Sequence, residues 1–328
     1  MLIYAGIDEA GYGPMLGPLC VGSSVFLMES HEDDGRVPDL WKHLERVVSR
    51  QLSKAKGRIT ITDSKKLKGA RSGQSHPLRH LERGVLTCLG AMETDSSLLD
   101  SLTEDDFFER LGIEVPDHPW YGDAGALPVA SDVGMLRIDS GRMRRAMKES
   151  GIRCVALRCE ALDAGDFNRK IDQIHNKSGV NMHLVIRQAE AIWKRFPGER
   201  PRIVVDRQGG KTSYRSDLRT AWPEARIKVV HESPELSRYE LELPGRGAMV
   251  MIFTAESEIH HLPVALASMT AKYSRELMMG RMNRFFLRRQ PGIRATAGYV
   301  EDARRYLAEI EPVLETDRIE RTDLIRCC

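Results

Sequence analysis

The chain has 328 residues, of which 41% are hydrophobic and 29% are charged, and its formal net charge at pH 7 is +2. This apolar content suffices for one large domain or two smaller ones, and the balanced charge says little about partners. No apolar run is long enough to span a bilayer, and no secretion signal pattern begins the chain. The six cysteines contain no C-x-x-C pair, which argues against a zinc site or a disulfide framework. Reduced thiols in a cytoplasmic protein are the simplest account.

The first quarter of the chain predicts strands and helices in alternation. Apolar runs at Leu2–Ile7 and Leu19–Met28 are joined by a turn rich in glycine and proline, so we expect a β-hairpin. A third strand is expected at residues 59–62. Helical spacing of apolar residues predicts helices at 40–52 and 76–90.

Two later segments break this alternation. Residues 91–150 hold several Asp, Pro and Gly residues, which predicts an insertion or long loop with a helix near Thr103–Leu111. Residues 207–256 hold short apolar runs separated by Pro and Gly, which predicts a strand-rich insertion.

The remaining apolar segments complete the expected fold. They are strands at Val155–Leu157 and Ile203–Val205, and helices at His183–Arg195, Leu262–Met282 and Ala303–Leu314. This order indicates an α/β fold, and the initial hairpin requires a mixed central sheet flanked by helices. We expect a single domain over residues 1–328, ending in a helical segment at 283–328.

Acidic side chains stand at the ends of two predicted buried strands. Asp8 and Glu9 follow the first strand, and Asp206 follows Ile203–Val205. A buried strand has no structural use for an unpaired carboxylate, and acids at strand ends of one α/β sheet tend to meet at one edge. Three or four such carboxylates bind Mg²⁺ or Mn²⁺. A pair of these ions can activate water and stabilise the leaving oxygen in phosphodiester cleavage.

The fourth acid has more than one interpretation. Glu276 lies in the long predicted helix on the same face as Ser268 and Lys272, which favours it as a ligand. It also follows Lys272 by four residues, so an ordinary ion pair within the helix accounts for it as well. Glu256 or Glu258, just before that helix, is the alternative fourth ligand.

Basic residues gather in two places. Each cluster is either a solvated face, which is the commoner case, or a set of phosphate contacts. The first contains Lys54, Lys56, Arg58, Lys65, Lys66, Lys68 and Arg71, and the second contains Arg281, Arg284, Arg288, Arg289 and Arg294.

Five motifs occur in a fixed order along the chain. They are Gly-Ile-Asp-Glu-Ala-Gly-Tyr-Gly-Pro within 5–18, Asp-Ser-Lys-Lys-Leu at 63–67, Val-Val-Asp at 204–206, Ala-Leu-Ala-Ser-Met-Thr-Ala-Lys-Tyr-Ser-Arg-Glu at 265–276 and Gly-Tyr at 298–299. Together they resemble the type 2 ribonuclease H family, ribonucleases HII and HIII. The first motif is similar to the family's Gly-x-Asp-Glu-x-Gly-x-Gly, and the fourth to its Ala-Ala-Ser-Ile-x-Ala-Lys-x-x-Arg-Asp helix.

The resemblance implies an RNase H-like fold and two-metal hydrolysis of RNA in RNA–DNA hybrids or of ribonucleotides embedded in DNA. Asp8, Glu9, Asp206 and Glu276 would be the catalytic acids that bind Mg²⁺ or Mn²⁺. The expected partner is therefore a hybrid or ribonucleotide-containing duplex, and we expect a monomer that is not attached to a membrane.

The resemblance also assigns substrate contacts. The backbone of Gly11, Tyr12 and Gly13 would face the 2′-hydroxyl, by which a protein distinguishes RNA from DNA. The other expected substrate-binding residues are Lys65, Lys66, Lys272 and Tyr299.

The chain departs from the family pattern at defined places. Tyr12 stands where ribonuclease HII usually has Arg, and Glu276 stands where Asp is usual. The interval from Asp206 to Glu276 is longer than in the family. These departures leave two alternatives open: a non-catalytic nucleic-acid-binding protein on the same fold, or a nuclease of other specificity.

Overall fold

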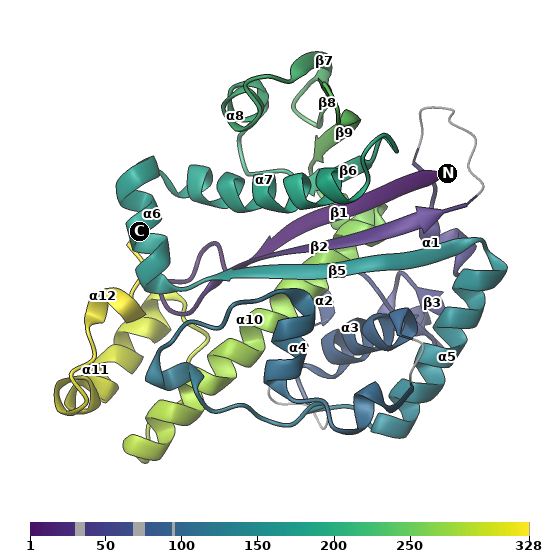
Figure 1. The fold of residues 1–328 in the computed structure, drawn as a ribbon. Helices are drawn as coiled ribbons and strands as arrows, with labels where there is room; N and C mark the ends of the chain where they lie inside the picture. Colours follow the sequence, from purple (N-terminus) through teal and green to yellow (C-terminus); the bar gives the residue numbers. More distant parts are fainter. Residues whose placement is uncertain (30–36, 68–75, 94–95, 328) are drawn as a thin grey trace.

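A mixed β-sheet crosses the centre of the computed structural model, which describes residues 1–29, 37–67, 76–93 and 96–327 (Figure 1). Its strand order is β5–β2–β1–β6–β9–β8–β7. β1 pairs antiparallel with β2 and parallel with β6, and β6 pairs parallel with β9. The strands are β1 (Leu2–Ala10), β2 (Leu19–Met28), β5 (Ile152–Leu162), β6 (Arg202–Asp206), β7 (Arg226–Glu232), β8 (Leu236–Leu243) and β9 (Gly247–Thr254). The predicted mixed α/β class is confirmed.

Helices cover both faces of this sheet, with α3, α4, α5 and α10 on one side and α7 and α8 on the other (Figure 1). The buried apolar side chains form two hydrophobic cores. Because side chains alternate along β1, Tyr4 packs in one core, and Ile3 and Ile7 pack in the other. The helices are α1 (Leu40–His43), α2 (Ser64–Leu67), α3 (Arg79–Met92), α4 (Glu104–Leu111), α5 (Val133–Glu149), α6 (Ala164–Ile174), α7 (Lys177–Arg195), α8 (Arg215–Ala221), α9 (Ser257–His260), α10 (Leu262–Arg289), α11 (Val300–Thr316) and α12 (Arg321–Leu324).

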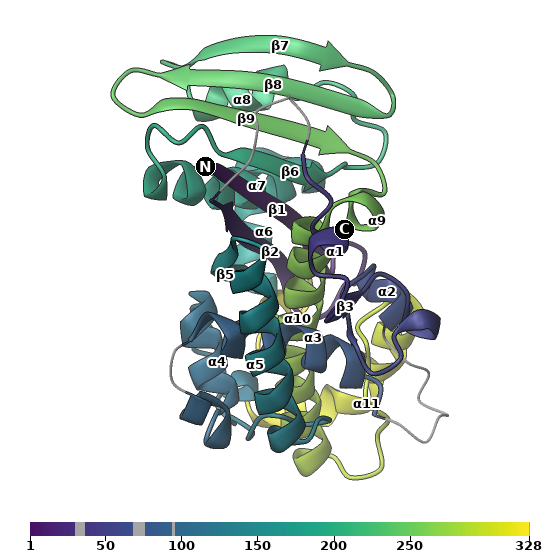
Figure 2. The ribbon, with the colours of Figure 1, turned by 90° about the vertical axis from the view of Figure 1, so that its right-hand side faces the viewer.

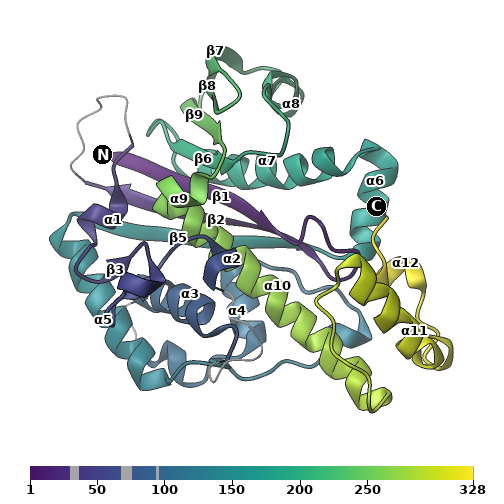
Figure 3. The same ribbon diagram turned by 180° about the vertical axis from the view of Figure 1, so that it is seen from behind.

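The long helix α10 packs directly on β1 and β2 (Figure 3). Two glycines permit the close approach. A Cβ at Gly6 would lie 2.2 Å from the carbonyl carbon of Pro263, and one at Gly22 would lie 2.4 Å from the carbonyl oxygen of Ala267. α10 ends at Arg289 rather than at the predicted Met282, so the predicted helical segment 283–328 begins inside this helix.

The prediction of one helix over residues 40–52 is wrong. The chain forms only the short helix α1 there and then turns into strand β3 (Val48–Ser49), which pairs with β4 (Ile59–Thr60). The indole N–H of Trp41 donates to the carbonyl oxygen of Ile61 at 2.8 Å. These contacts with a neighbouring segment override the helical spacing, and the β-branched Val48 suits a strand.

The described residues of the two predicted insertions form helices and strands of the fold (Figure 2). Residues 91–150 are mostly helical rather than a loop, because α5 buries one face against α3. The helix expected near Thr103–Leu111 is confirmed by α4, which Thr103 caps together with Asp106. Residues 207–256 are strand-rich, as expected: β9 joins the central sheet beside β6, and β8 and β7 extend it to an edge.

Two members of the first basic cluster, Lys68 and Arg71, lie outside the described residues. Within the ranges that the structure describes, no helix combines the length and the apolar character needed to cross a membrane.

Candidate metal centre and substrate loop

Asp8 and Glu9 lie just before Ala10, the last residue of strand β1, and face opposite sides of the sheet, as neighbours in a strand must. Asp8 is buried, which raises its pKa well above the usual range, and the hydroxyl of Ser268 on α10 opposes part of that rise. Glu9 faces α7, where the buried amide of Asn181 opposes part of the rise in the Glu9 pKa that burial and Asp206 cause. The two adjacent acids therefore reach the two helix layers from a single strand end.

Asp206 ends strand β6, immediately beside the end of β1. The parallel register pairs Ile7 with Val205, so Asp8 and Asp206 each follow a paired residue by one position. Ser257 at the start of α9 donates twice to the Asp206 carboxylate, from its backbone N–H at 3.1 Å and its hydroxyl at 2.6 Å. These bonds fix Asp206 at the edge of the sheet.

Glu258 on α9 joins Asp8, Glu9 and Asp206, and these four residues are called the acidic group below. Burial raises the pKa of Glu258, and the charges of Asp206 and Asp63 raise it further. Its Oε2 atom is buried and has no hydrogen-bond partner among the described residues. A buried carboxylate oxygen without a donor is costly unless a cation or a proton satisfies it.

The acids repel one another strongly enough to shift their titration. Burial raises the pKa of Asp8 well above its usual range, and the charges of Glu9 and Asp206 add to the rise. Burial and then the charge of Asp206 raise the pKa of Glu9 to about 7. The Lys65 ammonium group opposes this rise in both Glu9 and Glu258. Such repulsion is the condition that a divalent cation relieves.

The residue types present fit a hard divalent cation. Asp8, Glu9, Asp206 and Glu258 offer only oxygen donors, which Mg²⁺ and Mn²⁺ prefer. The unpartnered Oε2 of Glu258 supplies an acceptor that is not used within the described residues. In the described ranges, however, no three His, Cys, Asp or Glu side chains already converge as ligands of one ion.

Glu276 lies elsewhere on α10. It forms an ion pair with Lys272 at 3.1 Å, and both side chains are mostly buried. It follows Ser268, the α10 residue beside Asp8, by two helical turns, or about 12 Å along the axis. The largest charge contributions at Asp8 come from Glu9 and Asp206. The structure thus brings Glu258, the alternative fourth ligand, into the acidic group and gives Glu276 a basic partner.

The Asp-Ser-Lys-Lys-Leu motif forms the start of α2 beside the acids. Asp63 accepts from the Lys65 N–H at 2.8 Å and pairs with Lys66 at 3.9 Å. The Ser64 hydroxyl accepts from Ser268 at 3.0 Å, which ties the motif to α10. The motif therefore places both lysines, as well as a further carboxylate, beside the acidic group.

The glycine loop, residues 11–18, connects β1 to β2 and is exposed at Tyr12 and Gly13. Gly11 has φ = +88°, and a Cβ there would lie 2.4 Å from Nε of Arg275, so only glycine fits. The ring of Tyr12 is 37% exposed, and the Lys177 ammonium lies 5.2 Å from its centroid. Burial, and then the charge of Glu9, raise the pKa of Tyr12. The loop is thus both open to solvent and adjacent to the acids.

Tyr299 is 55% exposed and precedes α11. Its neighbour Gly298 accepts backbone hydrogen bonds from Met15 at 2.8 Å and Leu16 at 3.2 Å. The Gly-Tyr motif therefore lies against the glycine loop, although it is distant in sequence.

The second basic cluster is largely structural. Arg281 and Arg284 both bind the buried carboxylate of Glu104, and Arg288 pairs with Asp123 at 2.9 Å. These partners neutralise the charges that a phosphate would otherwise meet. Lys54 and Lys56 of the first cluster are exposed.

Sequence reasoning missed three residues of this site. Asp63 belongs to the Asp-Ser-Lys-Lys-Leu motif, in which the resemblance assigns a role only to the two lysines. Ser257 is separated from Asp206 by the whole predicted insertion, residues 207–256, and nothing in the sequence pairs them. Asn181 lies within a helix whose apolar spacing predicts packing alone, so no signal marked its amide.

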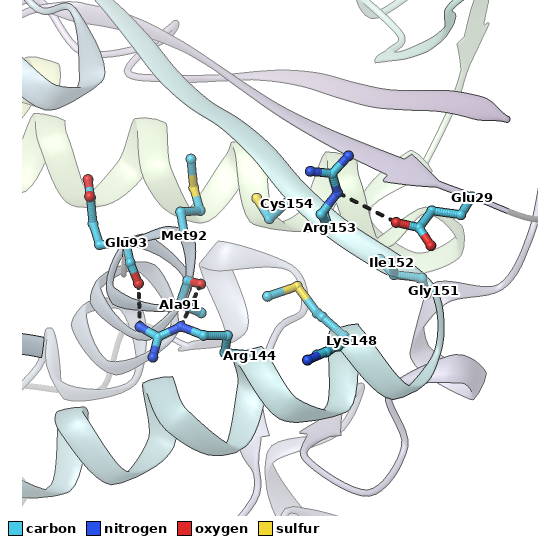
Figure 4. A pocket seen from close by; sticks show the side chains of 11 residues that line it. Glu29, Ala91, Met92, Glu93, Arg144, Lys148, Gly151, Ile152, Arg153 and Cys154 are labelled. Carbon is cyan, nitrogen blue, oxygen red and sulfur yellow. Dashed lines mark hydrogen bonds and ion pairs between the residues drawn. The ribbon is translucent and has the colours of Figure 1, made fainter. Parts of the chain in front are cut away.

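A cavity of about 630 Å³ lies away from these acids, between the end of α3, the end of α5 and the start of β5 (Figure 4). Met92, Ile152 and Cys154 contribute apolar surface, and Arg144 donates to backbone carbonyls at the end of α3. None of the predicted site residues lines it.

Comparison with known proteins identifies similar folds. No protein-family model and no curated protein sequence matches the chain. The structure of the PCNA:RNase HII complex from Archaeoglobus fulgidus has 13% identity and a TM-score of 0.44, covering 99% of this chain and 94% of that one. Bst-RNase HIII in complex with Mn²⁺ also has 13% identity and a TM-score of 0.44, covering 99% and 66% respectively.

A third structure, ribonuclease H2 from Pyrococcus horikoshii OT3, has 14% identity and a TM-score of 0.39, covering 98% of this chain and 92% of that one. The similar structures are of the family that the sequence motifs resemble.

Proposed function

We propose that the chain is a divergent type 2 ribonuclease H, a metal-dependent endonuclease that cleaves RNA in RNA–DNA hybrids or at ribonucleotides embedded in DNA. The observation that carries the proposal is the group of mutually repelling carboxylates at the ends of β1 and β6. A purely structural site would pair these acids with bases, as the chain does for Glu104.

The proposed roles follow from position. Asp8 and Asp206 would hold the metal from neighbouring parallel strands, and Glu9 and Glu258 would hold it from either side. Mg²⁺ or Mn²⁺, when bound, supplies activation of water and stabilisation of the leaving oxygen. The Lys65 ammonium group opposes the rise in the pKa of Glu9 and Glu258 and would meet a phosphate of the substrate.

The glycine loop would contact the ribose of the substrate. Exposed backbone N–H groups at Tyr12 and Gly13 suit close approach to a 2′-hydroxyl. The exposed ring of Tyr12 offers a surface on which a base can stack, an interaction worth about 1–3 kcal/mol per base. Tyr299, beside the same loop, would extend this surface.

A substrate panel tests the proposal. Single-stranded RNA, duplex DNA, an RNA–DNA hybrid and a duplex with one ribonucleotide are incubated with Mg²⁺ or Mn²⁺. We expect cleavage only of the last two, and its loss in Asp8→Asn and Asp206→Asn with the fold retained by circular dichroism. Cleavage of plain DNA or RNA instead would reassign the specificity. Binding without turnover under both metals would support a non-catalytic protein.

A further inference from the structure

A segment near the end of the described chain is fastened against the glycine loop. Ile325 forms an isolated antiparallel bridge with Leu16, and the backbone N–H of Arg326 donates to the carbonyl oxygen of Met15 at 2.9 Å. Asn168 on α6 holds the same segment through the carbonyl oxygens of Thr322 at 2.9 Å and Ile325 at 2.8 Å. Figures 1 and 3 show α12 beside α6 at this end of the molecule.

The side chain of Arg326 reaches into the loop itself. It is only 2% exposed, and its guanidinium lies 5.1 Å from the centroid of the Phe167 ring. Nη2 donates to the carbonyl oxygen of Gly11 at 2.6 Å and also to that of Pro14. One buried cation thereby holds both sides of the exposed tip formed by Tyr12 and Gly13.

Other hydrogen bonds hold the second half of the loop, and Arg275 also packs against Gly11. Gly298 accepts from the N–H groups of Met15 and Leu16, and Arg275 donates to the carbonyl oxygen of Leu16 at 3.0 Å. Within the described residues, the side chain that donates to the Gly11 carbonyl oxygen is that of Arg326. The orientation of the first peptide of the loop therefore depends on this arginine.

That peptide carries the group expected to face substrate. In a trans peptide the C=O and the following N–H point in opposite directions. Fixing the Gly11 carbonyl toward Arg326 therefore turns the Tyr12 N–H away from it. No described residue accepts a hydrogen bond from the Tyr12 N–H. The donor is thus oriented but left available.

We propose that Arg326 is a positioning residue that orients the Gly11–Tyr12 peptide so that its N–H is presented to the sugar of a ribonucleotide. This inference rests on the proposed function for its substrate. The claim that Arg326 fixes the loop does not depend on the substrate, and it is measured without substrate.

The test compares Arg326→Gln with a matched control, Arg321→Gln. Arg321 belongs to the same segment but is half exposed and pairs with Glu311 on the surface. Hydrogen exchange of the peptide spanning residues 10–17 is measured without substrate. Losing a charge-assisted hydrogen bond predicts exchange about tenfold faster, or more, in Arg326→Gln, and unchanged exchange in Arg321→Gln.

The second measurement is the preference of the protein for a ribonucleotide over the matching deoxynucleotide. Affinity is measured for a DNA duplex with one ribonucleotide and for the same duplex with the matching deoxynucleotide, in Ca²⁺. Arg326→Gln should lower the ratio of the two affinities several-fold while leaving the affinity for plain DNA unchanged. General destabilisation would weaken both equally. If wild type shows no preference but the loop loosens in Arg326→Gln, the proposed function fails and the loop-fixing role stands.

If Arg326→Gln does not fold, Asn168→Ala provides the second variant. It releases the segment from α6 without altering Arg326 and should also speed exchange in residues 10–17. Unchanged exchange in a folded Arg326→Gln, or in Asn168→Ala when the first is unfolded, would overturn the inference. Faster loop exchange with an unchanged affinity ratio would overturn the presentation of the Tyr12 N–H to substrate.

Discussion

Replacing Glu9 by Gln is expected to stabilise the metal-free protein at alkaline pH while abolishing cleavage. Burial and the charge of Asp206 raise the pKa of Glu9 from 4.5 to about 7. Because the folded-state pKa is raised, the contribution of Glu9 to stability is fully present below about pH 4.5 and is lost as the pH rises through about 7. The difference corresponds to roughly 3 kcal/mol at most, and partial exposure and screening reduce it to about 1–2 kcal/mol.

The assay is thermal unfolding in EDTA at pH 5 and pH 8. At pH 8, Glu9→Gln should unfold a few degrees above wild type, at about 2–4 °C per kcal/mol. At pH 5 the two should nearly coincide, because Glu9 is then protonated in the folded protein. Glu45→Gln, an exposed acid, should show no pH-dependent difference from wild type.

Two outcomes would refute this reasoning. A lower unfolding temperature for Glu9→Gln at pH 8 would show that the charged carboxylate stabilises the fold. Full cleavage by Glu9→Gln would show that Glu9 is not required in the site.

Three further predictions separate the roles of neighbouring residues. Glu258→Gln should reduce cleavage roughly 100-fold or more. Glu276→Gln should mainly release the ion pair with Lys272 and lower the free energy of urea unfolding by about 1 kcal/mol. The reverse pattern would restore Glu276 as the fourth ligand. Gly11→Ala should lose about 1–3 kcal/mol of stability and most activity, because φ = +88° and the nearby arginine leave no room for Cβ, and a fully active variant would show that the loop adapts. Tyr12→Ala should weaken binding of a ribonucleotide-containing duplex about tenfold if a base stacks there, while unchanged affinity would exclude stacking.

The sheet and three of its acids follow from local sequence. Apolar runs that end in carboxylates are visible in a single sequence, and the rule that such ends meet at one edge places Asp8, Glu9 and Asp206 together. The register of β1 and β6 agrees with that rule. No long-range information was required for this part of the site.

The fourth acid does not follow from local sequence. Helical spacing predicts which face of α10 a residue occupies, but not which residue along the helix axis lies beside Asp8. Ser268 and Glu276 share a face of α10, as the spacing predicts, yet they differ by two turns. Which of them meets Asp8 depends on how far α10 slides along β1, and Gly6 and Gly22 set that translation. Contacts of this kind are decided by packing between distant segments.

The wrong helix at 40–52 has the same origin. Its spacing suits a helix, but Val48 pairs with Ile59 and Trp41 bonds the neighbouring segment. Likewise, the pairing of Arg326 with the loop joins residues at opposite ends of the described chain, and no local pattern marks it.

Binding of Mn²⁺ tests most directly whether the acidic group is a metal centre. Titration calorimetry on wild type and Asp206→Asn, at pH 8 and without substrate, measures the affinity of each. The account predicts that wild type binds Mn²⁺ and that Asp206→Asn binds at least about tenfold more weakly, because the central carboxylate is lost. Equal affinity in the two proteins, or no binding by wild type, would contradict it.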